Sequence, residues 1–136
     1  MRNSIIKMVG KELVSELEKQ LNEFELLNLD AREIMNRVRK YNSFTIMCMY
    51  LLALEHNYKD LSFRIKRASE CIEIQIEEDF IKLANNNKED KLLSKLDKVD
   101  IINLAHRMNL YSLDKKEYEK LDKQNKKYFN ILSKYM

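Results

Sequence analysis

Residues 43 to 57 read SFTIMCMYLLALEHN, and the segment from Phe44 to Leu54 holds no charged side chain. A helix drawn over this stretch carries apolar side chains on every side. A helix of that kind belongs in the centre of a bundle or at an interface between subunits. The apolar run is far shorter than the roughly 20 residues that cross a bilayer. The stretch therefore predicts a central apolar helix at about 43–57, with a homodimer expected if other helices leave it uncovered.

The scarcity of glycine and proline extends this prediction to the whole chain. The sequence holds one glycine, Gly10, and no proline. Tight hairpins need glycine or Asn-Gly turns, whereas helix interiors disfavour both glycine and proline. Turns must then be built from Asn, Asp and Ser, as in the run Asn85 to Asn87. This composition predicts an all-α protein.

Periodic apolar residues predict helices on both sides of the central one. Their three- and four-residue spacings are typical of amphipathic helices. One predicted apolar face in the fourth segment includes Phe63, Ile65 and Ala68. We expect Asp30, Asp97 and Asp114 to cap helices, Asp30 and Asp114 as parts of capping boxes. The predicted segments besides 43–57 are Ser4 to Leu27, a short helix behind Asp30, Ser62 to Ala84, Lys88 to Asn109 with a break near Asp97, and Lys115 to Tyr135.

The connections between these segments are short, which favours antiparallel packing of neighbours. No linker or repeat divides the 136 residues, of which 45% are hydrophobic and 35% charged. We therefore predict one domain over 1–136, a compact bundle of about five to six helices. Residues Met1 to Leu27 carry charges throughout and do not resemble a secretory signal. The chain is expected to be cytoplasmic, with no membrane contact and with Cys48 and Cys71 as buried, reduced thiols.

Residues that carry chemistry are sparse. The two histidines, His56 and His106, have no Cys or second His at the spacings of a zinc site. We interpret His56 as a polar residue at the end of the apolar helix. Phosphate-binding loops need glycines that this chain lacks. The sequence thus predicts no enzyme, and no catalytic residue, cofactor or metal.

Charge is unevenly distributed along the chain. The segment Arg32 to Arg67 holds eight basic and three acidic residues, whereas Ala68 to Asn87 holds one basic and five acidic residues. Two interpretations are open: the cations pair with acidic groups on neighbouring helices, or they form a binding surface for an acidic partner or a nucleic-acid backbone. The predicted binding residues are Arg32, Arg37, Arg39, Lys40, Arg64, Lys66 and Arg67.

One stretch resembles a known family. Between Leu92 and Asn130, an apolar helix, a short turn and a leucine-containing final helix are similar to the second half of HEPN-type helical bundles, which occur in bacterial defence and toxin–antitoxin proteins. That family carries an Arg-x(4–6)-His ribonuclease motif, and Gln124 and Phe129 stand where its Arg and His would fall. The resemblance implies a degenerate, non-catalytic relative. The residues whose spacing resembles the family pattern are Lys95, Val99, Ile102, Ala105, Leu110, Tyr118, Leu121 and Asn125.

Three functional hypotheses follow. The first is a non-enzymatic protein-interaction module, such as an adaptor, inhibitor or accessory subunit. Usage rich in Lys, Asn and Ile is typical of AT-rich genomes and favours a phage or mobile-element origin. The second is a nucleic-acid-binding subunit that uses the basic residues and the lysines from Lys115 to Lys134. The third is a degenerate HEPN-like toxin or defence component.

Overall fold

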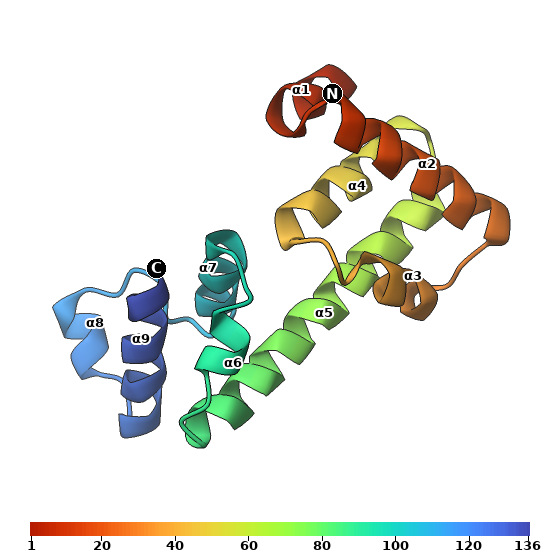
Figure 1. The fold of residues 1–136 in the computed structure, drawn as a ribbon. Coiled ribbons are helices and arrows are strands. Elements are labelled where there is room, and N and C mark those ends of the chain that lie inside the picture. Colours follow the sequence, from red (N-terminus) through yellow and green to blue (C-terminus); the bar gives the residue numbers. More distant parts are fainter. The chain divides into compact units, whose positions relative to one another are not determined.

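Helices are the only regular secondary structure of the protein. The computed structural model describes residues 1–136 and contains nine helices and no strands (Figure 1). The all-α prediction is confirmed, and the prediction of five to six helices is wrong. The helices are α1 (Arg2–Val9), α2 (Lys11–Leu27), α3 (Ala31–Val38), α4 (Ser43–Glu55), α5 (Lys59–Asn85), α6 (Asp90–Leu93), α7 (Lys98–Arg107), α8 (Lys115–Glu119) and α9 (Lys123–Tyr135).

The larger helix count arises because three predicted segments are broken. Gly10 separates α1 from α2 with φ 93° and ψ 153°, a conformation that is essentially restricted to glycine. Asp97 and Asp122 begin new helices because their side chains accept hydrogen bonds from the backbone N–H groups of Asp100 (2.9 Å) and Asn125 (2.8 Å). The break at Asp97 was predicted, and the other two were not.

Asparagine supplies the left-handed turns for which glycine is the usual residue, and aspartate supplies helix N-caps. Asn28, Asn57, Asn87 and Asn109 all adopt positive φ between 50° and 61°, where asparagine is tolerated better than most residues. Both predicted capping boxes are present, at Asp30 and Asp114. The prediction that turns are built from Asn, Asp and Ser is therefore confirmed for Asn, and Ser112 also adopts positive φ, whereas the aspartates act as helix N-caps.

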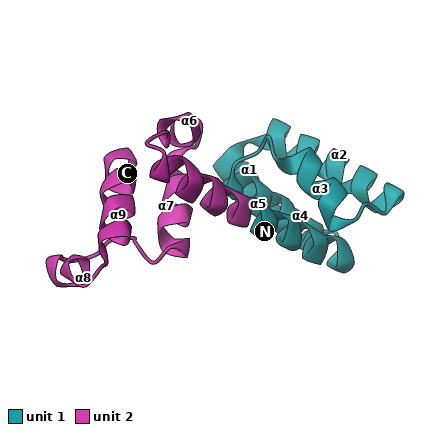
Figure 2. Ribbon diagram, turned by 90° about the horizontal axis from the view of Figure 1, so that it is seen from below, with its two compact units in different colours: residues 1–72 teal, residues 73–136 magenta.

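The chain divides into two compact units (Figure 2). Unit 1 is Met1–Ile72 and unit 2 is Glu73–Met136. Each has its own cluster of buried apolar residues. Helix α5 is continuous across the boundary and contributes to both clusters. That residues 1–136 form one cooperative domain stays a prediction.

The core of unit 1 is built around α2 and α4. Helix α2 buries one stripe of apolar residues, which includes Leu17, Leu21 and Phe24. Helix α4 occupies the stretch predicted as the central apolar helix, but it is buried on one side only. Met49 is 0% exposed, whereas Phe44 is 37% and Met47 is 59% exposed. The outward side of this helix consequently remains apolar and accessible in unit 1.

The core of unit 2 is organised by an aromatic pair. Phe80 of α5 meets Tyr128 of α9 edge-on, with ring centroids 5.6 Å apart. The Tyr128 hydroxyl donates to Oδ1 of Asn85 (3.0 Å) and accepts from Nε2 of Gln124 (2.7 Å). A nearly buried tyrosine thus keeps its polar end satisfied. These contacts fix α9 against the last turns of α5.

The two cysteines differ in environment. Cys48 is buried on the inner side of α4, and burial raises the pKa of its thiol. Cys71 is free and exposed, so the prediction that both thiols are buried is wrong for this residue. Its position on α5 falls outside the buried stripe Leu61, Ile65 and Ala68, which explains the difference.

Candidate functional site

The seven predicted binding residues all lie in unit 1, and two of them are engaged within it. Nη1 of Arg37 lies 3.0 Å from Oε1 of Glu23. Arg64 donates to the backbone carbonyl of Leu29, just beyond the C-terminus of α2, and its Nη2 lies 4.0 Å from Oε2 of Glu25. A cation is favourable at that end of a helix dipole. Internal pairing, one of the two interpretations of the basic segment, therefore holds for these two residues.

The other five predicted residues keep their charge on the surface. Arg32 and Arg39 on and just after α3, and Lys66 and Arg67 on α5, are exposed and form no ion pair. Lys40 is exposed too, with its Nζ 5.2 Å from the ring centroid of Tyr41. These cations can meet an external anionic group without breaking an internal contact.

A stripe of α5 places an exposed aromatic ring beside two of these cations, Lys66 and Arg67. Asp60, Phe63, Arg67 and Glu70 follow one another at spacings of three, four and three residues, which puts them on one face of the helix. Phe63 is 68% exposed, and the three charged residues are exposed as well. We call these four residues the α5 stripe. Lys66 flanks it, three positions after Phe63.

The placement of Phe63 corrects the sequence analysis, which put this residue on the buried side of its helix. The side that is buried runs through Leu61, Ile65 and Ala68, all 0% exposed. Phe63 lies two residues from both Leu61 and Ile65 and therefore faces away from that side. In the sequence, the spacing of four and three residues from Leu61 to Ile65 and Ala68 marks the buried face, and Phe63 does not fit this spacing.

Next to α3, a shallow hollow gathers two of the seven predicted cations. It is lined by Arg37 and Lys40 together with Gln20, Glu23 and Phe24 of α2. Glu23 neutralises the guanidinium of Arg37 in this hollow. The ammonium of Lys40 has no carboxylate partner and lies near the ring of Tyr41. The hollow is an open recess with a mixed polar and apolar lining rather than an enclosed binding cavity.

A partly buried carboxylate connects three elements of unit 1. Arg2 of α1 donates from Nε and Nη2 to the two carboxylate oxygens of Glu18, each at 2.9 Å. Nε2 of His56, at the C-terminus of α4, lies 2.7 Å from Oε2 of the same residue. The Arg2 hydrogen bonds lower the pKa of Glu18 against the opposing effect of burial, and His56 lowers it further. The predicted role of His56 as a helix-end residue agrees with this position.

Replacing Glu18 by glutamine should destabilise the fold in a pH-dependent way. The carboxylate stabilises the folded state when ionised, and its lowered pKa means that this contribution is complete above the unfolded value of about 4.3 and fades as pH falls through the lower, folded value. We expect E18Q to lower the free energy of unfolding by about 1 kcal/mol at neutral pH, a figure reduced for solvent screening. Urea denaturation at several pH values measures this difference.

Glu12→Gln is the matched control on the same helix, because Glu12 is exposed and forms no ion pair. It should leave the unfolding free energy unchanged across the same pH range. A deficit of E18Q that is equally large in strong acid and at neutral pH would contradict the assignment of the effect to the ionised carboxylate.

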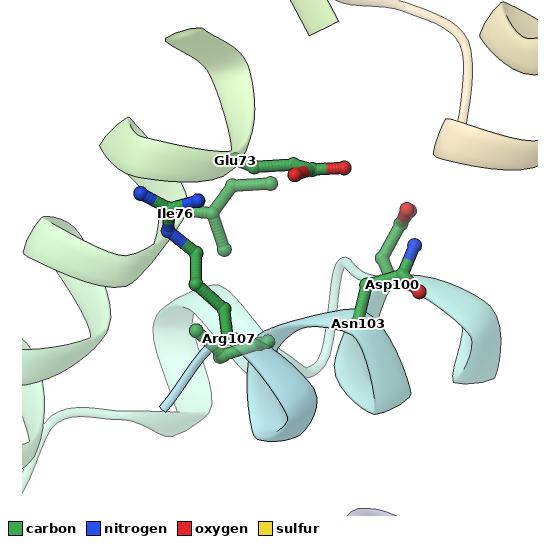
Figure 3. Close-up of a pocket in the computed structure, with 6 residues that line it drawn as sticks. Glu73, Ile76, Asp100, Asn103 and Arg107 are labelled. Atoms are coloured by element: carbon green, nitrogen blue, oxygen red, sulfur yellow. The ribbon is translucent and has the colours of Figure 1, made fainter. Parts of the chain in front are cut away.

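Unit 2 carries a hollow of a different character between α5 and α7. Glu73 and Ile76 of α5 and Asp100, Asn103, Leu104 and Arg107 of α7 line it. Figure 3 shows Arg107 extending from α7 along α5, with Glu73, Asp100 and Asn103 around the same space. The Arg107 guanidinium is paired with Glu77, Nε to Oε1 at 3.1 Å. The hollow is thus framed by an interhelical ion pair that fixes α7 on α5.

The positions relevant to the HEPN resemblance have structural contacts in unit 2. Gln124 donates to Tyr128, and Phe129 packs on Tyr118 with ring centroids 5.4 Å apart. His106 packs on Tyr111 at 4.1 Å. No group of three or more His, Cys, Asp or Glu side chains is arranged to hold a metal ion, and no helix has the length and apolar character to span a bilayer.

Comparison with known proteins gives no assignment: no protein-family model, no curated protein and no solved structure matches this chain.

Proposed function

We propose that the protein is a non-enzymatic interaction module that binds another protein through the α5 stripe and the exposed cations beside it. The observation that supports this most directly is the 68% exposed ring of Phe63, flanked along its helix by Asp60 on one side and by Arg67 on the other. Exposed aromatic and arginine side chains are enriched in protein interfaces, and such residues often dominate the binding energy.

The mixed signs of charge favour a protein over a nucleic acid as the partner. Asp60 and Glu70 stand on the same helical face as Phe63 and Arg67. A phosphate backbone is uniformly negative, so these two carboxylates would repel it. A protein surface can match both signs, with a carboxylate opposite Arg67 or Lys66 and a cation opposite Glu70. The partner we infer has an apolar recess for Phe63, rimmed by charges of both signs.

We place the protein in the cytoplasm as an accessory or inhibitory subunit. From the HEPN-like resemblance we further propose that it is a degenerate, non-catalytic toxin or defence component. Nucleic-acid binding remains the alternative, favoured by the unpaired cations Arg32, Arg39, Lys66 and Arg67.

A photo-crosslinker at position 63 tests the proposal. Benzoyl-phenylalanine in place of Phe63 in the full chain, expressed in its native cells, should form an adduct with one discrete protein, because the ring would lie in the partner's recess. The adduct should be lost when Arg67→Glu is added. Benzoyl-phenylalanine in place of Leu26, which is 85% exposed on α2, is the matched control and should give no such adduct.

Two outcomes would contradict the proposal. One is the same set of adducts from positions 63 and 26, which would show non-specific contact. The other is a nuclease-sensitive adduct at position 63, accompanied by binding of a single-stranded RNA homopolymer that weakens steeply as salt is raised. That second result would establish the nucleic-acid alternative in its place.

A further inference from the structure

We propose that the outward side of α4 is a self-association surface, on which two copies of the chain pair their α4 helices antiparallel. Phe44, Met47, Leu51 and Leu54 follow one another at spacings of three, four and three residues. This is the spacing of the seam in coiled coils and helix pairs. We call these four residues the α4 seam.

The seam is available because the opposite side of the helix is fixed in the core. Ile46, Met49 and Ala53 are 2%, 0% and 0% exposed, which sets the rotation of α4 within unit 1. Phe44 and Met47 are exposed, at 37% and 59%. Leu51 and Leu54 are partly buried, and Leu51 also packs against the core of unit 1. Exposed neighbours of this kind, without one charged residue among them, are uncommon on a surface that meets only water.

The charges near the two ends of the α4 seam favour a second copy of this chain as the molecule that binds there. Glu55 ends α4, is exposed and forms no ion pair, while Arg39 and Lys40 precede the helix and are exposed. In an antiparallel pair centred between Met47 and Leu51, Glu55 of one copy lies opposite Ser43 of the other. Arg39 and Lys40 lie four and three residues before Ser43, in the non-helical connection between α3 and α4, so each end of the pair brings opposite charges near one another.

The alternative orientation is disfavoured by the same charges. A parallel pair would place Glu55 beside the Glu55 of the second copy, and it would align the two helix dipoles. An antiparallel pair is self-complementary about a twofold axis, as closed dimers require. The apolar run from Phe44 to Leu54 then packs against its own reverse, with no charged group buried.

This surface is separate from the one proposed for partner binding. The α4 seam and the α5 stripe share no residue, and Met47→Glu changes neither the stripe nor an exposed cation, so that one proposal can fail while the other stands. The dimer that follows would carry two copies of the α5 stripe, and binding to a partner with two sites would then benefit from avidity.

Sedimentation velocity of the full chain over about 1 to 200 µM tests the inference, a range that covers weak dimers. The wild-type protein should move from monomer to dimer across this range. Met47→Glu should weaken self-association at least tenfold, since it buries a carboxylate between two apolar surfaces. The matched control is Met8→Glu on α1, because Met8 is 58% exposed and lies off the seam. It should dimerise like the wild type.

The orientation has its own test. Glu55→Lys should weaken the dimer, and adding Lys40→Glu and Arg39→Glu to that variant should restore it. A wild-type monomer at the highest concentration, an M47E variant that dimerises as tightly as the wild type, or an M8E variant that is equally impaired would overturn the surface assignment. Failure of the triple variant to recover, with its circular dichroism unchanged, would overturn the antiparallel arrangement.

Discussion

Met49→Ala should lower the free energy of unfolding by about 2 to 5 kcal/mol, the range measured when large apolar side chains are removed from protein cores. Met49 is 0% exposed and lies in the core cluster that α1, α2, α3, α4 and the first half of α5 share. Neighbouring helices are held by their own contacts and would close the resulting cavity only in part. Urea denaturation followed by far-ultraviolet circular dichroism at low micromolar concentration measures the loss.

Met47→Ala is the matched comparison, since the same side chain is removed two residues away on the same helix. Met47 is 59% exposed, and we expect its loss to change the unfolding free energy by less than about 0.5 kcal/mol, as at most surface positions. Equal losses from the two variants would mean that α4 does not sit in unit 1 with the rotation described above.

This pair of methionines also marks the limit of prediction from the sequence. The helix at 43–57 was predicted correctly, because an uninterrupted run of apolar residues is a local signal. Which side of it faces the core was not predictable, since no polar residue between Phe44 and Leu54 other than Thr45 distinguishes one side from another. The choice is made by α1 and α2, whose contacts with α4 are tertiary.

Caps and turns were predictable for the opposite reason. Asp30 and Asp114 bond to backbone groups three residues away, and Asn87 needs only its own tolerance of positive φ. These preferences act within one turn of the chain. The break at Gly10 was missed because the apolar spacing continues across it from Val9 to Leu13. A single glycine within a helical pattern does not by itself predict that the helix breaks there.

The candidate site was located only coarsely from the sequence. Local charge density predicted seven cations in unit 1, but it did not separate Arg64 from Arg67. Arg64 is bound to Leu29, which is 35 residues earlier in the chain, and Arg67 is not bound at all. The contact between Glu18 and His56 spans 38 residues. Partners at such separations are set by the packing of helices and leave no periodic trace in the sequence.

Phe80→Ala should have the largest effect in unit 2, lowering the free energy of unfolding by about 3 to 5 kcal/mol. Phe80 is 0% exposed, and its ring meets Tyr128 edge-on. The substitution therefore leaves a cavity and also removes an aromatic pair, which contributes about 0.5 to 1.5 kcal/mol in its own right. Phe63→Ala, on the same helix but 68% exposed, should change stability by less than about 0.5 kcal/mol.

The same variant decides whether residues 1–136 unfold as one domain, as the sequence predicts. Hydrogen exchange of backbone amides reports on each unit separately. Because α5 enters both cores without a break, we expect F80A to reduce protection at buried amides of α2 and α4 together with those of α7 and α9. Loss of protection confined to residues after Glu73, with wild-type protection before it, would refute the single-domain prediction and leave unit 1 as a domain that folds alone.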